Sequence, residues 1–213
     1  MNLRLHTSTI WLLVVGLLVL APAGVSHGQQ TPAKLAAADA DRFEKKWLEI
    51  ERYGARGASK SFQPDKARRT VLTEAETNAY LRLKIPSELP PGMVDPYISA
   101  LGGGKVSARA VLDLDAVRRS TAKPTLDLAM LLTGRLPVTA SGILRTRSGM
   151  ATFELESAAI AGIPIPKSLL QLVVTHYSRS AEFPNGISLD AQFALRSGIR
   201  EIDIQSRRAI IVQ

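Results

Sequence analysis

Apolar and polar residues alternate along several stretches of the chain. A period of two predicts β-strands with one face in the core and the other in solvent. The first such stretch begins at Pro96 and turns at three consecutive glycines, residues 102–104. Glycine readily adopts the positive φ angles that tight hairpin turns need. We therefore expect an antiparallel hairpin here, with strands at 97–101 and 105–114.

The same alternation recurs later in the chain and predicts more antiparallel strands. A second hairpin joins residues 135–147 to residues 151–159 through a turn at 147–149. Its strands are longer than the usual five or six residues, which favours a strongly twisted sheet. We also expect a single strand at 187–195 and a last hairpin that joins 199–204 to 208–212.

Two segments in the first half of the chain show the helical period of 3.6 residues. Residues 39–54 place Phe43, Trp47 and Ile50 on one narrow stripe, which should pack on a larger body or on a partner. A capping box at Thr73 and Glu76 predicts a second helix, which should end before Pro86.

Two apolar segments complete the predicted elements. Residues 166–177 follow Pro166, a residue typical of a first helical turn, and carry a wide apolar face. Residues 126–133 predict one or two further helical turns. The fold class is therefore α+β: a long, strongly twisted antiparallel sheet of hairpins that wraps an apolar helix, with an amphipathic helix near the N-terminus.

The first 28 residues indicate an export signal. Arg4 supplies a basic start, residues 11–20 (WLLVVGLLVL) are an unbroken apolar run, and small residues follow to Gly28. We divide the chain into a signal peptide at 1–28, an amphipathic helix and linker at 29–70, and an α+β domain at 71–213. The alternative is an uncleaved membrane anchor, although the apolar run is shorter than a typical span.

Composition excludes several kinds of chemistry. The chain has no cysteine, so it forms neither disulfides nor a lipidated N-terminal cysteine. Beyond the signal segment the one histidine is His176, so a zinc site of the usual His/Cys kind is not expected. We expect no cofactor and no metal. The net charge is +8, which suits peripheral contact with an anionic membrane surface better than nucleic acid at an exported location.

Catalytic motifs are weak. His176 has no evident partner acid and nucleophile, and the segment around Ser141 lacks the GxSxG frame. The acid pair Glu74 and Glu76 belongs to the capping box, while the pairs at Glu154/Glu156 and Asp113/Asp115 fall on the solvent face of predicted strands. We therefore expect a protein that is not an enzyme.

Two segments carry a resemblance to a known group. Residues 72–81 (LTEAETNAYL), residues 161–170 (AGIPIPKSLL) and the strand pair around the glycine turn resemble a set of exported bacterial proteins of unknown function. Those proteins are similar in layout to tubular lipid-binding (TULIP-like) domains. The resemblance covers residues 71–212 and implies a protein that handles lipid or another hydrophobic ligand in the bacterial cell envelope.

An apolar groove is the corresponding candidate site. Small residues such as Ala140 and Gly142 lie opposite large ones, which either lets a helix pack closely or leaves space for a ligand. The candidate groove residues are Leu126, Met130, Leu131, Leu144, Phe153, Leu169, Leu170, Val173 and Phe193. The candidate headgroup residues are Arg109, Arg145 and Arg147.

Two functions remain open at this point. The first is a non-enzymatic binding protein, periplasmic or extracellular, for lipid or an apolar small molecule. The alternative is an envelope scaffold whose core is closed and whose helix at 39–54 docks an unknown protein partner.

Overall fold

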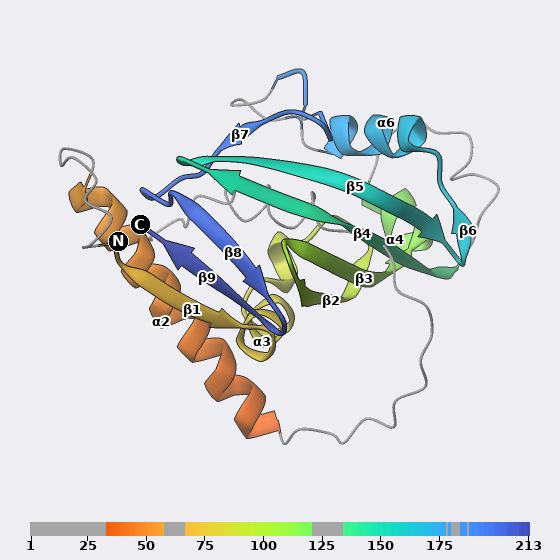
Figure 1. Ribbon diagram of the computed structural model, residues 1–213. Coiled ribbons are helices and arrows are strands. Elements are labelled where there is room, and N and C mark those ends of the chain that lie inside the picture. Colours follow the sequence, from red (N-terminus) through yellow and green to blue (C-terminus); the bar gives the residue numbers. More distant parts are fainter. Residues whose placement is uncertain (1–32, 58–66, 121–133, 178, 180–183, 187) are drawn as a thin grey trace.

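A computed structural model describes residues 33–57, 67–120, 134–177, 179, 184–186 and 188–213 (Figure 1). The predicted signal peptide, the apolar segment at 126–133 and most of the predicted linker lie outside these residues. The elements are α2 (Ala33–Gly57), β1 (Arg69–Thr73), α3 (Glu74–Leu83), the 3₁₀ helix η2 (Pro86–Glu88), β2 (Met93–Gly102), β3 (Lys105–Asp113), α4 (Leu114–Ser120), β4 (Arg135–Arg147), β5 (Met150–Ile160), β6 (Ile163–Pro164), α6 (Lys167–Tyr177), β7 (Phe193–Ala194), β8 (Glu201–Gln205) and β9 (Arg208–Val212).

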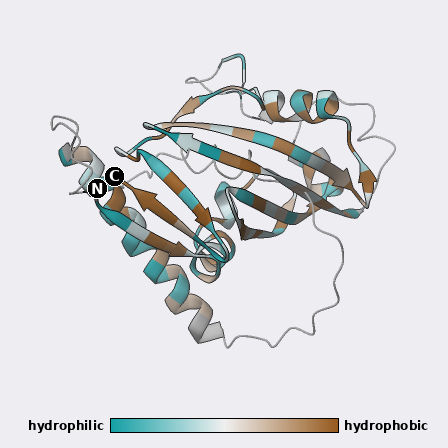
Figure 2. Ribbon diagram, viewed as in Figure 1, coloured by the Kyte–Doolittle hydropathy of each residue, from teal (hydrophilic) through white to brown (hydrophobic). Residues whose placement is uncertain are grey.

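Two antiparallel sheets form the body of the molecule, and the α+β class is confirmed. The larger sheet has the order β2-β3-β4-β5-β6, with β7 paired to the start of β5. The smaller sheet has the order β1-β9-β8 and lies at the left of Figure 1. Brown and teal residues alternate along β5 and β8 in Figure 2, as a half-buried strand requires.

Both long hairpins turn where the glycines predict. Gly103 and Gly104 link β2 to β3, and Ser148 and Gly149 link β4 to β5. All four residues have positive φ, between 50° and 82°. Two central residues with positive φ define the type I′ turn, whose twist matches that of the paired strands.

The capping box at the start of α3 is confirmed. The backbone N–H of Glu76 donates to Thr73 Oγ1 at 3.2 Å, and the N–H of Thr73 donates to Glu76 Oε2 at 3.0 Å. Lys46 on α2 also donates to the Glu76 carboxylate at 2.8 Å. This buried carboxylate therefore ties α2 to α3.

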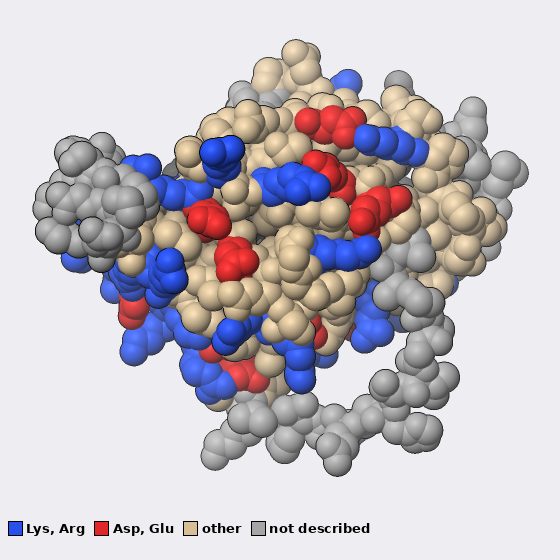
Figure 3. All heavy atoms as spheres, viewed as in Figure 1, with Lys and Arg blue, Asp and Glu red and all other residues tan. Residues whose placement is uncertain are grey.

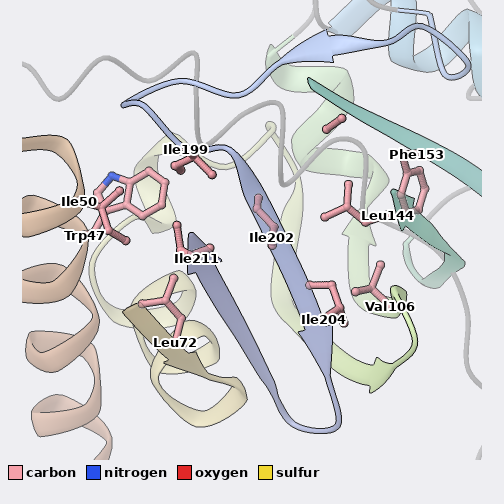
Figure 4. Close-up of a cluster of buried hydrophobic side chains, with 11 residues drawn as sticks. Trp47, Ile50, Leu72, Val106, Leu144, Phe153, Ile199, Ile202, Ile204 and Ile211 are labelled. Atoms are coloured by element: carbon pink, nitrogen blue, oxygen red, sulfur yellow. The ribbon is translucent and has the colours of Figure 1, made fainter. Parts of the chain in front are cut away.

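The N-terminal helical stripe packs inside the molecule. Trp47 and Ile50 of α2 are 5% and 0% exposed and belong to the largest hydrophobic cluster, which Figure 4 shows between α2 and both sheets. Phe43 stacks on Tyr80 of α3, with 4.5 Å between the ring centroids. Other segments of the chain thus cover the stripe. It packs on the larger body, as one of the two predicted possibilities, and not on a partner.

Three predicted features differ from the structure. The alternation at 187–195 yields only β7, because Leu189 and Asp190 form a turn against α6 instead. Asp113 and Asp115 are not on the solvent face of a continuing strand, because the Asp113 carboxylate accepts from the N–H of Ala116 at 2.9 Å and starts α4. The sequence pattern also missed β1, which exists only by pairing with the distant β9.

Among the described helices, none is both long and apolar enough to span a bilayer.

Candidate functional site

The candidate groove lies on one face of the ribbon formed by β4 and β5. Pairing of these strands places Ala140, Gly142 and Leu144 of β4 on the same face as Phe153 of β5. A bulge at Glu156 shifts the register between Leu155, which opposes Gly142, and Ser157, which opposes Ser141. One ribbon face therefore carries the apolar residues along its whole length.

One end of this face is closed. Leu144 and Phe153 are 6% and 5% exposed and pack in the cluster that contains Trp47 and Ile50 (Figure 4). A Cβ added to Gly142 would lie 2.4 Å from Phe153 Cζ, so the aromatic ring fills the space that the glycine leaves. Phe193 is partly buried against the same cluster. Of these three candidate groove residues, Leu144 and Phe153 are core residues and Phe193 packs against the core.

The other end of the face is covered differently. Ala140 and Ala158 are 1% and 6% exposed, and the side chains that cover them, from Leu155, Ile165 and Leu170, are only half-buried. We call this region, made of Ala140, Ala158, Leu155, Ile165 and Leu170, the alanine end.

The apolar residues of α6 and β6 differ in exposure. Leu169 and Leu170 are half-buried, whereas Leu172 is 60% exposed and Ile163 of β6 is 71% exposed. Val174 of α6 is 6% exposed, so this helix is covered at Val174, partly covered at Leu170 and open at Leu172. Val173 belongs to the same helix, while Leu126, Met130 and Leu131 lie outside the described residues.

The candidate headgroup arginines lie on the opposite face of the ribbon. Strand alternation points Arg145 and Arg147 away from the face that bears Leu144. Arg145 donates to Glu154 at 2.7 Å, and Arg109 stacks over the Tyr97 ring at 4.6 Å. Since Arg147 is seven residues from Ala140, it is also roughly 23 Å along the strand from the alanine end. Arg109 of β3 lies opposite Thr139, next to Ala140, but on the other face of the sheet from the alanine end.

A polar depression of about 400 Å³ lies beside Arg145 and Arg147, between the tip of the β4–β5 hairpin and β8. Its lining residues are Gly103, Gly104, Ile143, Leu144, Arg145, Thr146, Arg147, Met150, Thr152, Gln192, Glu201, Ile202, Asp203 and Ile204. Figure 3 shows this face with basic and acidic side chains interleaved. Charges of both signs on this surface offset each other, so it has no strong electrostatic potential of one sign. In the sequence, this surface is indicated by charged residues that alternate with core residues.

The ion pairs on this face are ordinary strand-surface pairs. Hydrogen bonding to Glu154 raises the pKa of Arg145, and the same contact lowers the pKa of Glu154. Lys105 pairs with Glu156 at 2.7 Å. Because its pKa is lowered, Glu154 keeps its charge at neutral pH and does not suit a general acid.

Three buried or partly buried titratable groups have shifted pKa values. Burial raises the pKa of Glu76, but hydrogen bonds from Lys46 and Thr73 outweigh it, and the pKa is lowered overall. Burial, together with the nearby Glu88 and Glu44, raises the pKa of Tyr80 to about 12. Burial and the hydrogen bond to Glu74 also raise the pKa of Tyr97. Within the described ranges, no three acids or histidines gather as a metal site would need.

No protein-family model, curated protein or solved structure matches this chain.

Proposed function

We propose that the chain is an exported, non-enzymatic binding protein for a lipid or another apolar ligand, held between α6 and the alanine end of the β4–β5 ribbon. The observation that carries this proposal is the contrast within one ribbon face. Leu144 and Phe153 are buried at one end, whereas Leu170 and Ile165 stay half-buried over two alanines at the other. A ligand that covers Leu170 and Ile165 removes apolar surface from water.

The energetics allow such a ligand. Burial contributes about 0.8 kcal/mol per methylene, so a long acyl chain contributes on the order of 10 kcal/mol before ordering costs. Leu155, Ile165 and Leu170 gather over the two alanines and stay partly open to water, and such grouped apolar surface is typical of an interaction site. The apolar residues at 11–20 and the net charge of +8 support export and contact with an anionic membrane surface.

The closed end of the ribbon supports the alternative function, an envelope scaffold. There Gly142 and Phe153 fit together without leaving space, as in a protein whose core holds no ligand. This alternative no longer includes docking by the α2 stripe, because Trp47 and Ile50 are core residues.

Two measurements separate these functions. Mass spectrometry of an organic extract of the purified protein should detect co-purified lipid, and the protein should bind a fluorescent fatty acid. Leu170→Trp fills the proposed site and should abolish binding. Leu83→Trp is the matched control, because Leu83 is an exposed leucine on a different helix, α3. A lipid-free protein that takes up no fatty acid favours the scaffold, and equal uptake by both variants contradicts the proposed location.

A further inference from the structure

The outer edge of β5 carries two short strands with a gap between them. β6 pairs with Ala159 and Ile160 at one end of β5, and β7 pairs with Met150 and Ala151 at the other. Both run antiparallel to β5, so they are the two ends of one interrupted edge strand. The chain leaves the sheet between them and forms α6 (Figure 1).

The backbone of β5 faces outward in this gap. The N–H of Leu144 donates to Gly104, away from β5, so Phe153, which opposes Leu144, directs its N–H and C=O toward the outer edge. Leu155 does the same two residues later. The carbonyls that flank this stretch, at Gly149 and Ala158, accept from Leu195 and Ile165. The outward groups of Phe153 and Leu155 have no hydrogen-bond partner among the described residues.

The backbone at the opposite edge of the sheet, β2, is covered by a side chain. There Asn78 of α3 accepts from the N–H of Ile98 and donates to its C=O, both at 2.7 Å, which covers the backbone of β2. An uncovered strand edge is a template for pairing with another strand. The described part of β5 has no such cover over Phe153 and Leu155.

Residues 188–192 match this vacant edge. Extending the register of β7, in which Phe193 opposes Ala151, brings Ala191 opposite Phe153 and Leu189 opposite Leu155. Apolar residues then meet apolar residues on the core face. On the polar face Gln192 lies opposite Thr152, and Asp190 lies opposite Glu154, a like-charge pair that disfavours the strand pairing. The alternation that predicted a strand at 187–195 thus has an unused partner in the fold.

In the structure the same residues hold α6 instead. The N–H of Leu189 donates to Gln171 Oε1 at 2.7 Å, and Lys167 pairs with Asp190 at 2.5 Å. Ala191 closes a turn by donating to the carbonyl of Ser188 at 3.2 Å. Since each residue can serve only one of the two arrangements, they exclude one another.

We propose that residues 188–192 are a switch segment with two states: a turn bound to α6, and a strand that extends β7 along β5. In the strand state α6 loses its contacts through Gln171 and Lys167. If the proposed function holds, this release opens the alanine end to the apolar ligand. The switch itself does not depend on that function.

Hydrogen exchange at Phe153 and Leu155 reports the state of the switch. Asp190→Lys repels Lys167 in the turn state and faces Glu154 in the strand state, so it should shift the equilibrium toward the strand. Exchange of these two amides should then slow by about tenfold or more, because the extended strand accepts their hydrogen bonds. Asp41→Lys is the matched control, since Asp41 lies on α2 and is an exposed ion-pair partner of Lys84. It should leave both amides unchanged.

Disulfide formation gives a second test in a chain that has no cysteine. Glu154→Cys with Asp190→Cys places the two thiols directly opposite in the strand state, within the Cα separation of about 4.4–6.8 Å that a disulfide needs. Glu156→Cys with Asp190→Cys is the out-of-register control. Faster linkage of the first pair supports the switch. Equal linkage of both pairs, together with unchanged exchange in Asp190→Lys, overturns it. A switch that operates without altering fatty-acid uptake would refute only its role in ligand entry.

Discussion

The two ends of the β4–β5 ribbon show how one pattern leads to two environments. At the Phe153 end, side chains from α2, β1, β8 and β9 pack around Leu144 and Phe153 and bury them. At the alanine end, half-buried residues from α6 and the chain just before it lie over Ala140 and Ala158. Both ends have the same alternation of apolar and polar residues. The difference therefore comes from the elements that the fold brings to each end.

Phe153→Ala should have the largest effect on stability. The ring is buried and also fills the space over Gly142, so its removal leaves a cavity that the backbone does not close. We expect a loss of about 3–5 kcal/mol in the free energy of unfolding, measured by urea denaturation. If Phe153→Ala lowers the free energy of unfolding by no more than replacement of an exposed phenylalanine would, this end of the ribbon is not closed.

Two leucines give the direct comparison of the ends. Leu144→Ala removes a buried side chain and should cost about 3 kcal/mol, whereas Leu170→Ala removes a half-buried one and should cost about 1 kcal/mol. The same urea titration measures both variants. Equal losses would show that the alanine end is packed as tightly as the other, which contradicts the proposed ligand site.

The Phe153 end also depends on the link between α2 and α3, and this link should respond to pH. Because the folded pKa of Glu76 lies below its ordinary value of 4.5, the carboxylate contributes stability above that pH and loses it as the pH falls. Glu76→Gln should therefore cost about 2 kcal/mol at pH 7 and progressively less below pH 4.5. Urea titrations at several pH values check this, and a difference that does not depend on pH would rule out the ionised Glu76 as the cause.

The smallest effect should come from the polar face of the ribbon. Arg145 and Glu154 are 63% and 50% exposed, so water screens their attraction. A double-mutant cycle of Arg145→Ala and Glu154→Ala should give no measurable coupling in the free energy of unfolding. A clear coupling would indicate that this face is organised for more than solubility.

Much of the fold follows from local patterns. The hairpin turns at Gly103–Gly104 and Ser148–Gly149 need positive φ, and the capping box at Thr73 and Glu76 is read from four residues. β1 was not predicted, because five residues gain their stability only by pairing with a strand that lies far along the chain. The turn at Leu189 was not predicted either, since the contact with Gln171 competes with the local preference for a strand.

For the candidate site, the sequence predicts which residues are apolar but not which side chains they contact. The sequence correctly indicates that Leu144, Phe153, Leu169 and Leu170 are apolar positions of a ribbon and a helix. It does not indicate that Gly142 and Phe153 fill one another's space, nor that Arg145 faces away from Leu170. Those facts depend on which side chains meet across strands.

The sequence by itself determined the hairpins, the capped helix and the face that each strand turns inward, because these features depend on residues close together in the chain. Only the tertiary structure decided that α2 completes the core, that one end of the ribbon is filled by Phe153, and that α6 rests on two alanines at the other end. The physical reason is that burial depends on neighbours brought together from distant segments. A local pattern identifies the side that is apolar but not what covers it.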